Sequence, residues 1–86
     1  MSASDEYIFN NELCIRVKEL RTKRGWTAAQ MATALGVPPD RYRKYETRSP
    51  LPAYLMPRFC LIVSCDFEYL LTGKSIKAAH THSSKE

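Results

Sequence analysis

The segment that most constrains the fold is a twenty-residue window from Ala28 to Thr47. Ala, Gln, Met and Leu dominate its first eight residues, and these residue types lose little side-chain entropy in a helix. Gly36 follows, at the point where a left-handed backbone conformation would end that helix. Pro38 and Pro39 suit the first turn of a second helix, where the amide hydrogens need no helical partner. The apolar positions of the window are Met31, Leu35, Val37, Tyr42 and Tyr45.

Two short helices joined by a tight turn that contains glycine form the helix-turn-helix pattern. The window predicts one helix over 28–35, capped by Thr27, and a second over about 39–47. Ala32 is small, as is required where two helices cross closely, and the apolar positions can fill the wedge between them. Seven structural positions agree within this window, which an unrelated pair of basic helices would rarely achieve. The residues themselves therefore predict a helix-turn-helix.

A longer amphipathic helix is predicted before the window, because Leu13, Val17 and Leu20 recur on one helical face. Its ends are marked by the asparagines at 10 and 11, the cations Lys23 and Arg24, and Gly25. The expected domain then covers residues 10–73, with an N-terminal arm at 1–9 and a polar tail at 74–86.

Proline-rich sequence predicts a loop over 47–52, followed by a separate turn at 53–55. A fourth helix is expected from Met56 or Pro57, because proline is tolerated only in the first turn. Asp66 can cap a short last helix over 67–71, which Gly73 closes. These elements complete an all-α bundle of five helices.

The length of 86 residues supports a single small domain, which buries about 60–65% of its unfolded surface. The longest apolar-rich stretch, 59–65, is far shorter than the ~20 residues that span a bilayer. The acidic N-terminal sequence lacks the apolar core of a secretory signal. Three cysteines at scattered spacing suit a reducing compartment. We therefore expect a cytoplasmic protein without membrane contact, either a binding module or an unusually small enzyme.

Positive charge is concentrated in the middle of the chain. Residues 16–48 hold nine Lys and Arg against three Asp and Glu, a net charge of +6, whereas the whole chain carries +4. Clustered cations gain most by displacing counterions from phosphates. The distribution favours a face that binds a polyanion, and a solvated helix face is the alternative that charge alone leaves open.

The stretch from about Val17 to Gly73 resembles the Cro/C1-type (XRE, phage-repressor-like) helix-turn-helix family. The resemblance is carried by Leu20-Arg21, Gly25-Trp26-Thr27, Met31-Ala32, Leu35-Gly36-Val37, Tyr42, Tyr45-Glu46, Pro52 and Leu70-Leu71-Thr72-Gly73. It implies a compact five-helix, lambda-repressor-like DNA-binding domain that binds double-stranded operator DNA as a homodimer.

Four positions depart from the family pattern. Ala28 stands where the family often has a glutamine that contacts a phosphate, and Pro38-Pro39 replaces a frequent Ser or Thr cap. Arg48 stands where glycine is common, so it is expected to add a phosphate contact at the cost of a strained loop.

The resemblance makes the helix at about 39–47 the recognition helix, placed in the major groove. Arg41 and Lys44 are the expected base readers, because both suit the O6 and N7 acceptors of guanine. Asp40 has two open interpretations: it accepts a hydrogen bond from cytosine N4, or it provides favourable charge at a helix N-terminus. Thr27, Arg43 and Arg48 are the expected phosphate-binding residues.

Several residues have expected structural roles. Arg21 and Glu46 resemble the family's internal ion pair between the first helix and the end of the third. Ala32 and Gly36 are expected to allow the helix crossing and the turn. Trp26 and the two tyrosines, Tyr42 and Tyr45, are interpreted as core residues rather than as base-stacking residues.

Metal binding and catalysis find little support in the residue pattern. The candidate metal ligands are Cys14, Cys60, Cys65, His80 and His82, but no Cys-x2-Cys pair is present. The sequence shows no Ser/His/Asp constellation with a supporting fold and no glycine-rich phosphate loop. We therefore expect no metal, no cofactor and no enzymatic activity.

The expected function is sequence-specific binding of double-stranded DNA by a transcriptional regulator, most commonly a repressor. The alternative is a protein-interaction module with the same fold, such as an antitoxin-like protein. In that case the arm residues Tyr7, Ile8 and Phe9, or the tail, would bind a protein partner.

Overall fold

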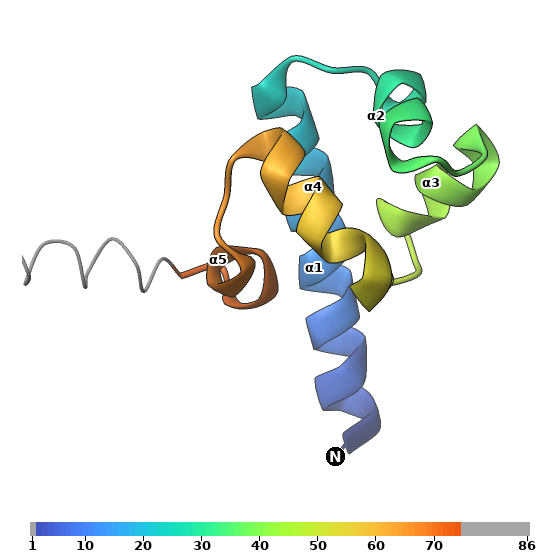
Figure 1. The fold of residues 1–86 in the computed structure, drawn as a ribbon. Coiled ribbons are helices and arrows are strands. Elements are labelled where there is room, and N and C mark those ends of the chain that lie inside the picture. Colours follow the sequence, from blue (N-terminus) through green and yellow to red (C-terminus); the bar gives the residue numbers. More distant parts are fainter. Residues whose placement is uncertain (1, 75–86) are drawn as a thin grey trace, which may run out of the picture.

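The computed structural model describes residues 2–74, with side chains from residue 5 onward. This part of the chain is all α-helical apart from one 3-10 turn, and it contains no strand. The elements are α1 (Ser2–Arg24), α2 (Ala28–Leu35), α3 (Pro39–Tyr45), η1 (Ala53–Leu55), α4 (Met56–Val63) and α5 (Phe67–Thr72). Figure 1 shows α1 running past all the other helices, with α2 and α3 on one side of it and α5 on the other.

The ends of α2 are fixed by local contacts. Thr27 Oγ1 accepts a hydrogen bond from the Gln30 N–H at 3.1 Å, and Gln30 Oε1 accepts one from the Thr27 N–H at 2.8 Å. This reciprocal capping satisfies two amide groups that a helix start leaves unpaired. Gly36 ends the helix with φ 75°, and the Val37 N–H bonds the Ala32 carbonyl at 3.0 Å. Both ends lie where the sequence predicts them.

α3 begins without a side-chain cap. Pro38 occupies the cap position in an extended conformation, and Pro39 is the first helical residue. Because proline has no amide hydrogen, these two positions add no unpaired donor to the helix start. The helix ends at Tyr45, and the amide groups of Arg48 and Ser49 both bond the Lys44 carbonyl, at 2.9 and 2.8 Å.

One apolar core joins all the helices. Its members that are completely shielded from solvent are Leu13, Val17, Met31, Ala32, Tyr42, Phe59 and Leu70. The rings of Tyr42 and Tyr45 meet edge to face, with centroids 6.1 Å apart, a geometry that aromatic quadrupoles favour. Trp26 is partly buried and packs against the core. The prediction that both tyrosines belong to the core is confirmed.

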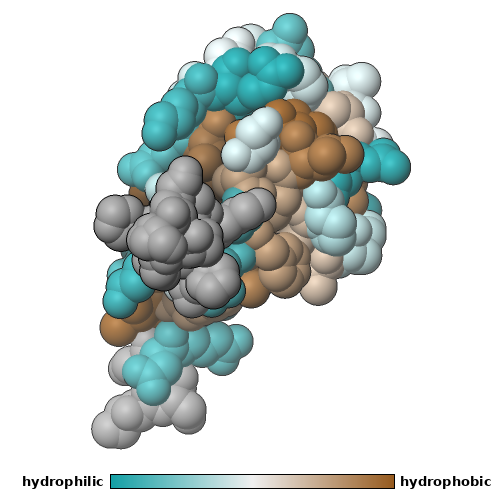
Figure 2. All heavy atoms as spheres, turned by 60° about the vertical axis from the view of Figure 1, so that its left-hand side comes forward, coloured by the Kyte–Doolittle hydropathy of each residue, from teal (hydrophilic) through white to brown (hydrophobic). Residues whose placement is uncertain are grey.

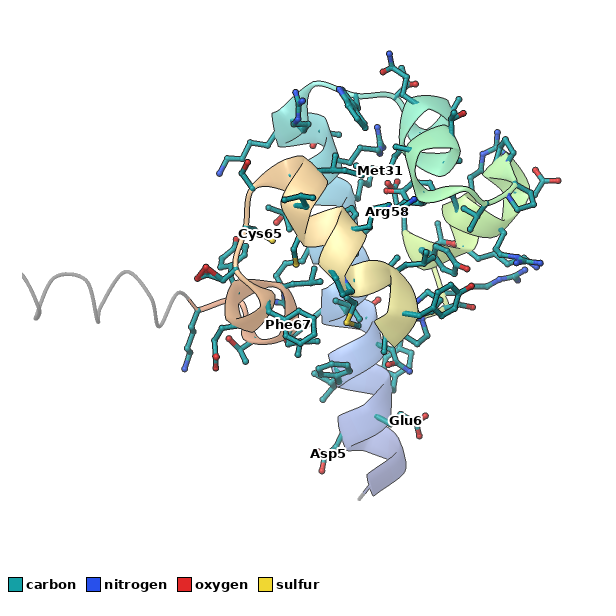
Figure 3. All side chains as sticks on the ribbon, viewed as in Figure 1. Asp5, Glu6, Met31, Arg58, Cys65 and Phe67 are labelled. Carbon is teal, nitrogen blue, oxygen red and sulfur yellow. The ribbon has the colours of Figure 1, made fainter. Side chains whose placement is uncertain are left out.

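α1 begins at Ser2 rather than at Asn10 or Asn11, so residues 2–9 continue the helix instead of forming a separate arm. The predicted start was wrong because no proline or glycine interrupts the chain before Gly25. Asp5 in the first turn also interacts favourably with the positive end of the helix dipole. We call residues 2–9 the N-terminal extension. Figure 3 shows Asp5 and Glu6 on this part of α1, which projects beyond the other helices.

Two arginines of α1 close the carbonyl ends of later helices. Arg16 Nε and Nη2 donate to the Leu70 and Leu71 carbonyls at 2.8 and 3.1 Å. Arg24 Nε donates to the Ile62 carbonyl at 3.1 Å, and its guanidinium lies 4.9 Å from the centre of the Trp26 ring. A cation at a helix C-terminus is favourable because of the helix dipole. Part of the positive charge in the segment 16–48 therefore holds the fold together.

Among the described residues, no helix has the length and apolar character needed to cross a membrane.

Candidate nucleic-acid interface

The outer face of α3 carries charged side chains. Tyr42 and Tyr45 are buried on the inner face, and the outer residues Asp40, Arg41, Arg43 and Lys44 are all exposed. This division follows from the helical period, which places residues three apart on one face. The structure thus brings the three predicted base-reading residues and Arg43 together on one short surface.

Asp40 and Arg43 form an ion pair on this surface. Arg43 Nη1 lies 3.0 Å from Asp40 Oδ1, and the two side chains are 67% and 91% exposed. An exposed pair of this kind contributes little to stability and can rearrange at small cost. The pair places a cation beside the one carboxylate of the surface, which offsets its repulsion of phosphates. The structure is therefore compatible with both interpretations of Asp40, as an acceptor for cytosine N4 and as favourable charge at the helix N-terminus.

Arg41 and Lys44 have free charged groups. Neither side chain forms an ion pair or a hydrogen bond with the part of the chain that the structure describes. Arg offers a fork of five donors and Lys a flexible group of three. Both cations are consequently available to an acceptor outside the protein.

A nearly buried ion pair fixes the end of α3 against α1. Arg21 Nε and Nη2 donate to the two Glu46 carboxylate oxygens at 2.6 and 3.1 Å, and the side chains are only 11% and 9% exposed. Arg21 Nη1 also donates to the Trp26 carbonyl at 2.8 Å, and the Tyr42 hydroxyl donates to Glu46 Oε2. The structure brings together the two residues expected to pair.

This network raises the pKa values of Arg21 and Tyr42. The hydrogen bond with Glu46 raises the pKa of Arg21 above its ordinary value. Burial, followed by the hydrogen bond to Glu46, raises the pKa of Tyr42. Both groups therefore stay protonated at neutral pH, where Arg21 and the Tyr42 hydroxyl can donate to Glu46.

Thr27 is exposed at the start of α2. Its Oγ1 accepts from the Gln30 amide, which leaves the hydroxyl hydrogen free to donate to a phosphate oxygen. Gln30 completes this cap, and sequence analysis did not identify it. The signal was present, because Thr followed three residues later by Gln before an apolar run is a capping-box pattern.

Comparison with known proteins gives a family for this arrangement. A family described as a helix-turn-helix domain matches residues 12–56, which is more than half of the chain. The chain belongs to this helix-turn-helix family. No curated protein and no solved structure gave a match. Helix-turn-helix domains place a helix against DNA, so membership indicates DNA as the partner, in a class of domains that is typically non-enzymatic.

The helix-turn-helix match extends from α1 to the first residue of α4. It therefore includes the whole of α2 and α3 and the Arg21–Glu46 pair. The N-terminal extension and α5 lie outside the match. Features that are particular to this chain are therefore expected mainly in these two parts.

Arg48 lies in the turn that leaves the helix-turn-helix. The expected strain there is wrong, because among the described residues the only non-glycine with a positive φ is Ser64, at φ 59°. The turn closes instead through successive amides that bond the Lys44 carbonyl, a geometry that any L-residue adopts. Arg48 thus presents an exposed guanidinium next to α3 without a backbone penalty.

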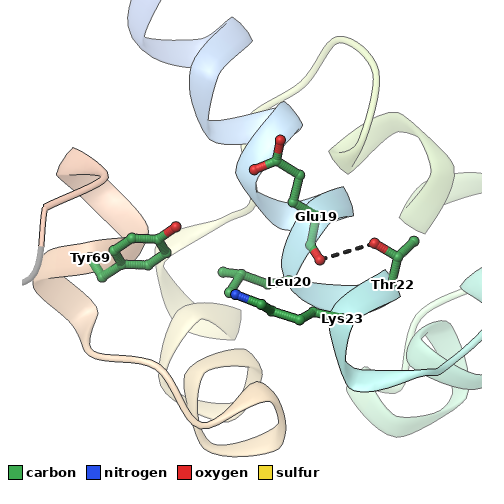
Figure 4. Close-up of a pocket in the computed structure, with 5 residues that line it drawn as sticks. All are labelled: Glu19, Leu20, Thr22, Lys23 and Tyr69. Atoms are coloured by element: carbon green, nitrogen blue, oxygen red, sulfur yellow. Dashed lines mark hydrogen bonds between the residues drawn. The ribbon is translucent and has the colours of Figure 1, made fainter.

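Away from α2 and α3, the surface combines charged side chains of both signs with exposed apolar ones. Figure 4 shows a pocket between α1 and α5, of about 380 Å³, lined by Glu19, Leu20, Thr22, Lys23 and Tyr69. A carboxylate and an ammonium group both line this pocket, so it does not offer a purely positive lining that would favour a phosphate. On the face that Figure 2 turns forward, apolar surface lies among polar surface. The most exposed apolar side chains of α4 and α5 are Leu61, at 80%, and Phe67, at 50%.

The described residues contain no group of three or more His, Cys, Asp or Glu side chains that could hold a metal ion. Cys60 and Cys65 lie close together, with their sulfurs 3.7 Å apart, and Cys14 donates to the Ser49 carbonyl. His80 and His82 lie outside the described residues.

Proposed function

We propose that this chain is a sequence-specific, double-stranded-DNA-binding transcriptional regulator of the Cro/C1 type, and that it acts as a repressor. The observation that supports this most is the exposed, charged outer face of α3 opposite a fully buried tyrosine face. A helix so divided is fixed in orientation by its core side and can read a groove with its outer side.

Each residue of the surface has a proposed role. Arg41 and Lys44 read guanine in the major groove, and Asp40 accepts from cytosine while Arg43 shields its charge. Arg43, Arg48 and Thr27 bind phosphates and set the register of the protein on the duplex. Residues 10–73 form the DNA-binding domain in this proposal, and no residue acts as a catalyst.

We further propose that the regulator binds its operator as a homodimer. Exposed apolar residues outside α2 and α3, such as Phe67 on α5, provide a surface for a second copy. A two-fold dimer of a helix-turn-helix protein binds two half-sites about one helical turn apart, so its operator repeats as a palindrome.

Selection of bound sites from a random duplex library tests the function. We expect a palindromic consensus with guanines at the positions read by Arg41 and Lys44. Recovery of unrelated sequences, with equal affinity for random duplexes, would contradict sequence-specific binding. A consensus of one half-site alone would contradict the dimer.

A second candidate function is favoured by one observation on the N-terminal extension. Tyr7, Ile8 and Phe9 are 70%, 50% and 42% exposed, which is a large apolar exposure on one short segment. An antitoxin-like protein could bind a protein partner there. Ile8→Glu or Phe9→Glu would then prevent binding of the product of a neighbouring toxin-sized reading frame, whereas duplex affinity would stay unchanged.

A further inference from the structure

A cavity lies where the N-terminal part of α1 meets the turn after α3. It has a volume of about 290 Å³ and is lined by Tyr7, Asn10, Asn11, Thr47 and Arg48. Three of these residues come from one helix and two from a turn that follows 36 or more positions later in the sequence. The cavity exists because α1 begins at Ser2 and continues past this turn as a helix.

Hydrogen-bond donors dominate the lining. Arg48 offers a guanidinium, the two asparagines offer amide hydrogens, and Tyr7 offers a hydroxyl. Within residues 5–74, the side chains of Tyr7, Asn10, Asn11 and Arg48 have no hydrogen-bond partner. The Thr47 hydroxyl donates to the Arg43 carbonyl at 3.0 Å and keeps its acceptor side. No carboxylate lines the cavity.

One cation with several neutral donors, and no acid in the lining, matches an anion that has several oxygen acceptors. A phosphate group meets this description, because it accepts a two-point contact from Arg and further bonds from amides and hydroxyls. A bare cation or an apolar ligand would leave these donors unpaired.

We propose that this cavity binds a phosphate group, with Tyr7, Asn10 and Asn11 acting together with Arg48. The group belongs to the DNA backbone beside the recognition helix, in which case the inference rests on the proposed function, or to a free phosphate compound. Tyr7, Asn10 and Asn11 then add phosphate contacts from outside the matched helix-turn-helix.

Two acids of the extension oppose this binding. Glu6 lies four residues before Asn10 and thus on the same helical face, and Asp5 precedes it; both are exposed and neither lines the cavity. Figure 3 shows both on the projecting end of α1. Neutralising the acid that shares the face of Asn10, with Glu6→Gln, is therefore expected to tighten phosphate binding by about two- to threefold.

A double-mutant cycle on the full chain tests whether the residues share one phosphate. Affinity for a fixed duplex is measured by fluorescence anisotropy at constant salt. We expect Arg48→Gln to weaken binding about tenfold and Asn10→Ala or Tyr7→Phe about threefold. The loss of affinity in each double variant should be close to that of Arg48→Gln alone. It should be much smaller than the product of the two single losses, because the effects of coupled residues are not additive. Lys74→Gln, which removes one exposed charge beyond α5, is the matched control and should change affinity less than twofold.

A second arm identifies the source of the phosphate. Inorganic phosphate and pyrophosphate are titrated into isotope-labelled protein without DNA, and the signals of Asn10, Asn11 and Arg48 are followed by NMR. Saturable shifts at these residues support the cavity as a site for a free phosphate compound. A coupled loss of duplex affinity without such shifts supports the DNA backbone as the source.

The proposed function and the cavity proposal can be contradicted independently of each other. A wild-type chain that binds no duplex contradicts the proposed function, and the titration with phosphate still decides the cavity. If the wild type binds duplex, but Asn10→Ala and Tyr7→Phe bind equally well and phosphate moves no signal, the cavity proposal is overturned.

Discussion

Glu46, the residue that follows α3, joins the end of this helix to Arg21 of α1. Its carboxylate receives two hydrogen bonds from Arg21 and one from the Tyr42 hydroxyl, and it is only 9% exposed. Removing one side of such a pair leaves a charge that is neither hydrated nor compensated. The cost of a substitution here should therefore be far greater than at any exposed charge of the same helix.

We expect Glu46→Ala to lower the free energy of unfolding by about 3–5 kcal/mol, because Arg21 would lose its partner inside the protein. The measurement is urea denaturation followed by circular dichroism. Asp40→Ala is the matched control: it breaks the exposed pair with Arg43 and should cost about 0.5 kcal/mol or less. Equal losses for the two variants would contradict the structural role of Glu46.

Arg41→Ala and Lys44→Ala test base reading by single residues. Each variant should lose about 1–3 kcal/mol of discrimination at one base-pair position, while the rest of the consensus stays the same. Site selection with each variant measures this directly. Arg43→Ala should instead weaken binding to all sequences by a similar factor, since a phosphate contact carries no base preference. An unchanged consensus for both base-reading variants would show that the roles are wrongly assigned.

At the scale of the element, two glycines end their helices for different reasons. A side chain at Gly36 would meet no atom within 4 Å, so alanine there suffers only from the positive φ of 75°. At Gly73, with φ 78°, the added carbon would lie 2.9 Å from Arg16 Nη1. That contact would displace the guanidinium that caps α5.

Gly36→Ala should therefore cost about 1–2 kcal/mol of stability, which is the conformational penalty alone. Gly73→Ala should cost more, by about 1 kcal/mol, because it also weakens the bonds from Arg16 to the carbonyls of α5. Thermal denaturation of both variants and of Arg16→Ala measures the difference. If the added cost comes from the arginine, Gly73→Ala should cost no more stability than Gly36→Ala when both are measured in an Arg16→Ala background. An equal added cost in both backgrounds would exclude that explanation.

The corner between α4 and α5 should be sensitive to alkaline pH. Burial raises the pKa of the Cys65 thiol from 9.0 to about 12, and it also raises the pKa of Cys60. The folded state thus holds these protons more tightly than the unfolded state, so their contribution to stability is complete below pH 9 and declines as pH rises toward 12.

We expect the free energy of unfolding to fall above pH 9, by at most about 1.4 kcal/mol per pH unit for each thiol. Denaturation between pH 7 and pH 11 measures this slope, and Cys65→Ala should reduce it. In both the wild type and Cys65→Ala, loss of the Tyr42 proton also lowers the free energy of unfolding above pH 10. The difference between the two curves therefore isolates the contribution of the Cys65 thiol. Parallel curves for the two proteins would contradict this account.

At the scale of the whole molecule, the charge available to DNA is smaller than the charge of the sequence. Of the nine cations in residues 16–48, Arg16, Arg21 and Arg24 are engaged in internal contacts. With Arg43, Arg48 and one further cation on phosphates, affinity should fall by about ten- to a hundredfold between 50 and 200 mM salt. Titration of a duplex at several salt concentrations measures the slope. A flat dependence would contradict phosphate binding, and a slope of about eight, which corresponds to nine phosphate contacts, would show that the internal arginines also reach DNA.

Local signals explain why much of the fold follows from the sequence. The bounds of α2 depend on Thr27 and Gly36, and the start of α3 on Pro38 and Pro39, so neighbours within a few positions decide them. The start of α1 depended on the lack of a stop signal, and capping residues at Asn10 and Asn11 pointed to a later start than the structure has.

Non-local contacts explain what could not be predicted. The bonds from Arg16 to α5 join residues more than 50 positions apart, and the lining of the cavity joins Tyr7 to Arg48. No spacing rule within a single helix indicates either contact. The charged outer face of α3 was predictable because one helical period decides it, and the same period places Asp40 and Arg43 three residues apart on that face, where they pair.

The paired prolines at 38 and 39 have a consequence for how such a regulator could change. They start α3 through the geometry of their own rings, without a hydrogen bond from any side chain at the cap. Arg41 and Lys44 form no ion pair or hydrogen bond within the described residues, and Asp40 forms only an exposed pair with Arg43. These three positions therefore contribute little to folding, since the inner tyrosines and Glu46 fix the orientation. Chains that differ at these three positions would fold alike and prefer different operators, so new specificities could arise without a loss of stability.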